Sequence, residues 1–212
     1  MAETRANLAQ IFQAVADTLL LHRETLNQAD TINGNHGEHM LEIFRTATQA
    51  IAEKPGMDLA EEMDAASQLL TRLSANGSAQ VYGRGLAQFA LQFREHQVTL
   101  EELLAYVQGV AREKTDESPQ AASPRSGEVL KALVGGLSGW QQSGSSVNQG
   151  ERKLDMGGLF EMGMAYLQAK QRGGNRLEVL ADAAASASPL SQVPYRYQSG
   201  KLALQALLQA MV

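Results

Sequence analysis

The chain has 212 residues, of which 44% are hydrophobic and 19% charged; this is typical of a folded globular domain and excludes an intrinsically disordered chain. Its formal net charge is -5 and no Lys/Arg cluster stands out, which argues against nucleic-acid binding. Cysteine is absent, and neither a membrane span nor a signal peptide is predicted, so we expect a cytoplasmic protein without a membrane partner.

Helical periodicity begins near the N-terminus. Apolar residues recur on one helical face over residues 4–26, which predicts the first helix. Residues 27–37 have no periodicity and the composition of a loop. The next stripe runs over residues 40–51, and its helix is expected to end at Pro55-Gly56, where proline disfavours helix before it and glycine can take a left-handed cap.

Further helices follow to the C-terminus, some with clear start signals. Asp58 with Glu61, and Thr99 with Glu102, are spaced as helix caps. The remaining helices are expected over residues 59–73, 79–96, 103–110, 128–140, 154–170, 176–187 and 204–211. Residues 113–127 and 189–200 are expected to be an exposed insertion and a loop.

These helices predict one all-α domain over residues 1–212. Aromatics are only 5% of the chain, and most residues are small or unbranched helix formers. Eight or nine helices with short connections favour antiparallel neighbours, in a bundle or a closed barrel. Polar ligands would then bind at one end, where loops collect.

The polar loop after the first predicted helix is the strongest candidate for a site. Asp30, Asn33 and Asn35 offer oxygen atoms, and two glycines allow a tight turn before a helix that begins near His36. A helix start of this kind can bind an anion, because its free amides point at the ligand. Oxygen ligands beside a phosphate would suit Mg²⁺.

Two other interpretations of this loop are open. In the first, the loop serves only as a helix cap, with Asn33 or Asn35 accepting hydrogen bonds from the amides of the next helix. A transition-metal site built from Asp30, His36 and His39 is the other alternative, since imidazole and carboxylate suit Zn²⁺.

The loop also resembles a known family signature. Leu26-Asn27-x-x-Asp30, followed by Asn33-Gly34-Asn35-His36-Gly37-x-x-Met40, is similar to L-N-x-x-D and G-D-G-D-H-G-x-x-M of the nucleotide-binding (L) subunit of dihydroxyacetone kinase. Weaker similarities follow at residues 77–83, 100–103, 150–153 and 198–200. The resemblance covers nearly the whole chain and is strongest up to about residue 112.

The resemblance implies a closed barrel of eight antiparallel helices that binds ADP or ATP with Mg²⁺. It implies phosphoryl transfer to dihydroxyacetone (glycerone), or a related small keto compound, held by a separate dihydroxyacetone-binding kinase subunit; a homodimer is the other assembly to consider. The implied metal positions are Asp30, Asn33 and Asn35. The implied nucleotide positions are His36, Gly37, Glu38, His39, Gly77, Ser78, Ala79 and Gly200. No catalytic base is assigned.

This chain departs from the family pattern in its metal positions. Asn33 and Asn35 stand where the family has aspartates, and the spacer after Asp30 is two residues shorter. Asparagine keeps an oxygen but not the charge, and each lost charge–charge contact with a divalent ion weakens binding. Two hypotheses follow: an active phosphotransferase subunit, or a degenerate homologue that binds another ligand or acts as a regulatory or interaction subunit.

Overall fold

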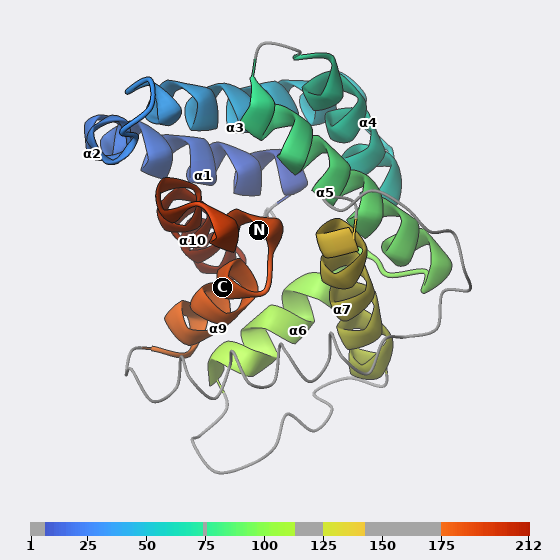
Figure 1. The fold of residues 1–212 in the computed structure, drawn as a ribbon. Coiled ribbons are helices and arrows are strands. Elements are labelled where there is room, and N and C mark those ends of the chain that lie inside the picture. Colours follow the sequence, from blue (N-terminus) through green and yellow to red (C-terminus); the bar gives the residue numbers. More distant parts are fainter. Residues whose placement is uncertain (1–6, 74–75, 113–124, 143–174) are drawn as a thin grey trace, which may run out of the picture.

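The computed structural model describes residues 7–73, 76–112, 125–142 and 175–212. Within these ranges the chain is all-helical, with nine α-helices, one short 3-10 helix and no strand, which confirms the predicted fold class (Figure 1). The elements are α1 (Leu8–Leu21), α2 (Arg23–Ala29), α3 (His36–Ala52), α4 (Leu59–Arg72), α5 (Gly77–Glu95), α6 (Leu100–Arg112), α7 (Ser126–Gln142), α9 (Arg176–Ser186), η1 (Pro189–Gln192) and α10 (Pro194–Ala210).

Two groups of packed helices share the core. Helix α1 lies between α3 and α10, and α5 lies between α4 and α7 (Figure 1). One cluster of buried apolar side chains draws on all nine of the described α-helices. A smaller cluster, formed by Leu137, Trp140, Ala187 and Leu190, joins α7 to the chain just before α10 and packs on Tyr82.

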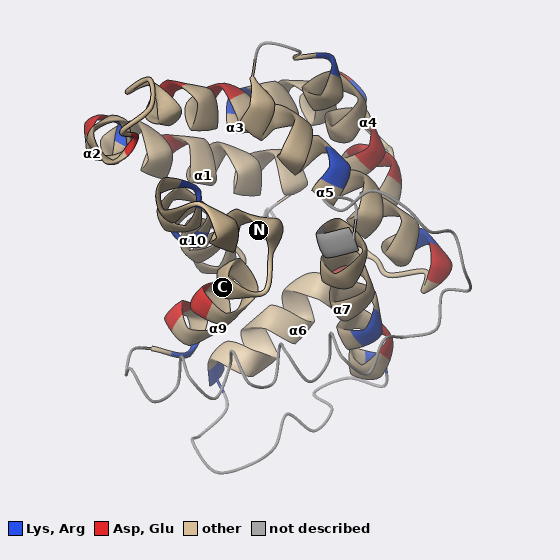
Figure 2. Cartoon of the chain, viewed as in Figure 1, with Lys and Arg blue, Asp and Glu red and all other residues tan. Residues whose placement is uncertain are grey.

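Most of the described charged residues are exposed or half-buried, whereas Asp30 and Asp182 are buried. Figure 2 shows Lys and Arg spread over separate helices among acidic residues in this view. None of the described helices is both long and apolar enough to cross a membrane.

The predicted start and stop signals are confirmed where the structure describes them. Asp58 accepts a hydrogen bond from the Glu61 amide, and the Glu61 side chain bonds back to the Asp58 amide. Thr99 and Glu102 make the same reciprocal pair. Gly56 takes the left-handed conformation (φ +90°) that its position after Pro55 suggested.

The single helix predicted over residues 4–26 is wrong, because the chain breaks at His22. Its backbone leaves helical geometry there (φ -103°, ψ 6°), while its amide and its ring Nδ1 both bond to the Thr18 carbonyl. Helix α2 then starts at Arg23 in a new direction and continues to Ala29 (Figure 1). Asn27 is therefore helical, and the predicted loop over residues 27–37 shrinks to residues 30–35.

The loop predicted over residues 189–200 is also wrong. A 3-10 turn at Pro189–Gln192 leads directly into α10, which starts at Pro194 and runs for 17 residues. Proline suits the first helical position, because its fixed φ is helical and its missing amide hydrogen has no partner there anyway. The short last helix predicted at residues 204–211 is thus only the second half of α10.

Other helix boundaries differ from the predicted ones by fewer residues. Helix α5 begins at Gly77, two residues earlier than predicted, and α7 begins at Ser126, inside the predicted insertion. Most of that insertion, and the helix predicted over residues 154–170, lie outside the described residues.

Helices α5 and α7 approach closely because α7 carries glycines on the facing side. A Cβ added at Gly135, Gly136 or Gly139 would lie 2.1 to 2.5 Å from atoms of the α5 side chains Gln92, Phe89 and Gln88. Real Cβ contacts are never that short, so these side chains lie directly on the α7 backbone.

Candidate functional site

Asp30 organises the loop between α2 and α3. Its side chain is only 6% exposed, and Oδ1 accepts a hydrogen bond from the Ile32 amide at 3.1 Å. Burial raises the pKa of the Asp30 carboxyl, but hydrogen bonds from the amides of Ile32, Asn33 and Asn35, together with nearby His36, lower that pKa overall. Gly34 provides the left-handed turn (φ +67°) that closes the loop. The carboxylate is thus engaged by its own loop.

The capping role predicted for Asn33 or Asn35 is wrong. Asn33 is exposed, and Asn35 precedes α3 without making a side-chain capping bond. The Gly37 amide instead donates to Oδ1 of Asn27, on α2, at 2.7 Å. Oδ1 of Asn35 is buried and has no hydrogen-bond partner, so the loop contains one unused buried oxygen.

The first turn of α3 packs tightly on α2. A Cβ added at Gly37 would lie 2.3 Å from the Arg23 carbonyl oxygen, so only glycine fits. Nδ2 of Asn27 donates to Glu38 at 3.0 Å, and Glu38 is also 3.7 Å from Nε of Arg23. Gly37 and Glu38, both predicted to face phosphates, are thus held by contacts within the protein.

His36 joins the start of α3 to α10. Its side chain is 2% exposed, its Nε2 lies 2.7 Å from Oγ of Ser199, and its ring meets the edge of Tyr195 at 4.7 Å between centroids. Burial, more than any other effect, lowers the pKa of His36 to about 4, so the imidazole is neutral at pH 7. This contact links residues 163 positions apart in the sequence.

Asn76 joins the start of α5 to the same end of α3. It is 2% exposed, accepts a hydrogen bond from the Ala79 amide at 3.0 Å, and donates to the His39 carbonyl and the Glu42 carboxylate. Predicted positions Gly77 and Ser78 follow directly. Since Asn76 already holds the Ala79 amide, that amide is not free for a ligand.

The predicted site segments therefore converge. We call this region the corner, and define it as loop residues 30–35 with the starts of α3, α5 and α10. Gly200 belongs to the corner by sequence position, one residue after Ser199, but its role is packing. A Cβ at Gly200 would lie 2.4 Å from Cδ1 of Leu190, so η1 rests directly on α10.

Three aromatic and cationic residues of the corner were not assigned from sequence. Tyr195 contacts His36, the Arg196 guanidinium carbon lies 5.9 Å from the Tyr195 ring centroid, and Tyr82 packs against Phe44 and Trp140. Recognising Pro194 as a helix start would have placed Tyr195, Arg196 and Ser199 on one helix, with Tyr195 and Ser199 a turn apart.

The loop over residues 30–35 holds only one carboxylate, Asp30. Among the described residues, no group of three or more His, Asp or Glu side chains could hold a metal ion, so Asp30, His36 and His39 do not form the alternative Zn²⁺ site. For Mg²⁺, the loop offers one carboxylate, Asp30, and the neutral oxygens of Asn33 and Asn35. This set does not fit two divalent ions, which depend on several carboxylates or substrate phosphates.

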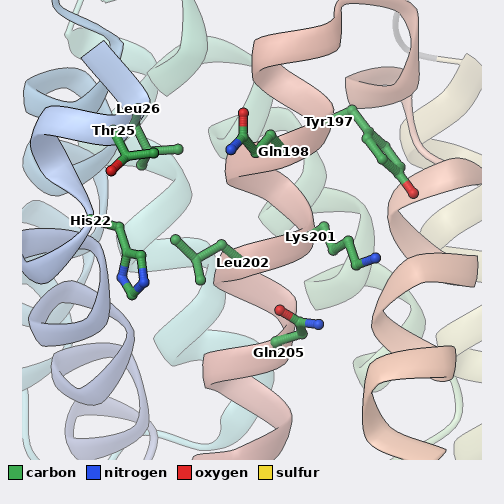
Figure 3. Close-up of a pocket in the computed structure, with 8 residues that line it drawn as sticks. All are labelled: His22, Thr25, Leu26, Tyr197, Gln198, Lys201, Leu202 and Gln205. Carbon is green, nitrogen blue, oxygen red and sulfur yellow. The ribbon is translucent and has the colours of Figure 1, made fainter. Parts of the chain in front are cut away.

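A separate groove of about 250 Å³ lies between the α1–α2 break and α10. In Figure 3, His22, Thr25 and Leu26 face Gln198 and Leu202 across it, whereas Tyr197 and Lys201 point toward the neighbouring helix. Both of these bond to Asp182 of α9. None of the predicted site residues lines this groove.

Comparison with protein-family models, with curated proteins and with solved structures gives no match. The family resemblance therefore rests on the sequence motifs alone.

Proposed function

We propose that this chain is a degenerate homologue of the dihydroxyacetone kinase L subunits, in which the corner binds a phosphate-bearing ligand without acting as a two-Mg²⁺ phosphoryl-transfer centre. One observation carries this proposal. The corner is assembled from segments far apart in sequence, yet its loop holds a single carboxylate, which already accepts hydrogen bonds from backbone amides of that loop. The proposal includes the family's closed antiparallel arrangement of eight helices.

A binding or regulatory role suits the remaining chemistry of the corner. His36 is neutral, buried and bonded to Ser199, so it is a fixed hydrogen-bonding group and not a ready cation. Gly37 and Glu38 bond to α2. A ligand would thus meet a preformed surface of polar side chains.

The second candidate is the active subunit, which uses Mg²⁺ and ADP or ATP to phosphorylate a small keto compound on a partner subunit. The buried, unpartnered Oδ1 of Asn35 favours it, because this oxygen is free to ligate a cation beside Asp30. Catalysis would then rest on positioning and charge neutralisation.

Isothermal titration with ADP and ATP, in Mg²⁺ and in EDTA, separates the two candidates. We expect binding that is equal in both buffers and retained by Asp30→Asn, which removes the charge but keeps an acceptor oxygen. Binding only in Mg²⁺, lost in Asp30→Asn, would instead support the active kinase. No binding of either nucleotide at millimolar concentration would contradict both.

The double variant Asn33→Asp/Asn35→Asp is the complementary test. If the loop keeps the family geometry, restoring the two charges should create Mg²⁺-dependent nucleotide binding. Unchanged binding in Mg²⁺ would show that the shortened loop no longer forms a metal site.

A further inference from the structure

Besides the acceptor Oδ1 of Asn35, two hydrogen-bond donors at the corner are buried without partners. They are the Tyr82 hydroxyl and Nε of Arg196. Burying an unsatisfied donor costs free energy, and native proteins contain few such groups. Their presence on two different helices, α5 and α10, calls for a common explanation.

The two groups lie in the same region of the molecule. Arg196 lies one turn before Gly200 on α10, so both are on the same side of that helix. Gly200 rests on Leu190, and Leu190 belongs to the small apolar cluster on which Tyr82 packs. The charge of Arg196 also lowers the pKa values of Tyr82 and His36, which requires that it lie near both, although burial raises the pKa of Tyr82 overall.

Both groups are donors. None of the ion pairs among the described residues involves Arg196, so its charge is not matched by a carboxylate there. Since burial keeps the Tyr82 phenol protonated, it can donate a hydrogen bond. The Tyr195 ring supports the guanidinium from one side.

We propose that Arg196 and Tyr82 form a metal-independent binding site for a phosphate oxyanion, beside the His36–Ser199 pair. A guanidinium matches the oxygen geometry of a phosphate, and charge-assisted hydrogen bonds are the strongest available to a side chain. Arg196 thereby supplies the positive charge that the carboxylate-poor loop cannot recruit through a metal. This inference rests on the proposed function and names the residues that carry it.

The test uses the full chain in EDTA, titrated calorimetrically with inorganic pyrophosphate and with ADP. The informative variants are Arg196→Gln and Tyr82→Phe, and the matched control is Arg84→Gln, which removes an exposed arginine from α5. We expect each informative variant to weaken pyrophosphate binding by at least about tenfold, and the control to bind within about twofold of wild type.

Thermal unfolding without ligand separates binding from structure. Because the two donors are unsatisfied, Tyr82→Phe and Arg196→Gln should melt at or above the wild-type temperature while losing the pyrophosphate-induced shift. A merely structural role would lower the melting temperature of the free protein instead, and would overturn the proposal.

The remaining outcomes are distinct. Wild-type binding in EDTA that both variants retain overturns the Arg196–Tyr82 site but leaves the proposed function intact. Binding confined to Mg²⁺ and insensitive to Arg196→Gln overturns the site and the metal-free function together. ADP bound much more tightly than pyrophosphate, with the same variant effects, supports the site and shows that a nucleoside adds further contacts.

Discussion

At the level of single residues, Gly37 is the position where the corner tolerates least change. The structure leaves 2.3 Å between an added Cβ and the Arg23 carbonyl, which belongs to backbone and cannot rotate away. We expect Gly37→Ala to destabilise the protein by about 1–3 kcal/mol, the usual cost of overpacking. Urea unfolding would measure it. Gly77→Ala, where nothing lies within 4 Å, is the control and should cost much less.

His36 predicts a pH dependence of stability. Its pKa is about 4 in the folded protein, below the ordinary value of 6.5. Between these two pH values the imidazole is therefore protonated in the unfolded chain but stays neutral in the folded one. Stability should therefore fall as the pH drops from about 6.5 to about 4, by about 1.4 kcal/mol for each unit of the pKa difference.

Two measurements check this. NMR titration of the imidazole Cε1 proton should give a pKa well below 6. Urea unfolding of His36→Gln should show a smaller loss of stability between pH 6.5 and pH 4 than wild type. A titration near pH 6.5 would contradict the expected burial effect.

At the level of elements, the caps show what local sequence can establish. Asp58 and Thr99 were correctly identified because a cap and its partner lie three residues apart, so the signal is local. The His22 break was missed because the apolar stripe continues through it. The α10 start was missed because residues 189–200 have loop composition, although Pro194 suits a helix start.

The candidate site, too, could be predicted from the sequence only where the signal is local. The sequence identified the loop around Asp30, since its composition is unusual over a few residues. It did not reveal that the Gly37 amide donates its hydrogen bond to Asn27 and not to Asn35, or that His36 forms a hydrogen bond with Ser199. Both contacts depend on how the helices pack against one another. Arg196 could not be predicted as a site residue, because an isolated arginine in the sequence carries no sign that its Nε is buried without a hydrogen-bond partner.

Asn76 provides a test of a cap that serves two helices. Asn76→Ala would remove the bond to the Ala79 amide and both bonds to α3, leaving a buried amide unsatisfied. We expect a loss of about 2–3 kcal/mol, above the usual cost of about 1 for a cap. The control is Asn175→Ala, which removes an exposed cap from α9. Chemical denaturation should show a larger loss of stability for Asn76→Ala than for Asn175→Ala.

At the level of the whole molecule, the shared core predicts cooperative unfolding. The main apolar cluster includes residues of all nine described α-helices, and Tyr82 and Phe89 connect it to the small cluster that contains Trp140. Trp140 is the only tryptophan in the chain. Its fluorescence should report the small cluster, while far-UV circular dichroism reports all helices.

We expect both signals to give the same denaturation midpoint, as two-state unfolding requires. An earlier fluorescence transition would show that α7 and the chain before α10 separate from the rest first. Tyr82→Ala, which removes the ring between the clusters, should widen any gap between the two midpoints.

The glycines of α7 have a consequence for how this protein can vary over evolution. A Cβ added at Gly136 would meet the Phe89 ring, whereas at Gly135 and Gly139 it would meet the amide ends of Gln92 and Gln88, which can move away. Tolerance to substitution at this contact is therefore unequal: Gly136 is held by a rigid ring, and the other two glycines are opposed by flexible side chains. In a library of all single substitutions, Gly136 should be nearly invariant among folded variants, Gly135 and Gly139 should accept alanine, and Gly127, at the open start of the same helix, should vary most.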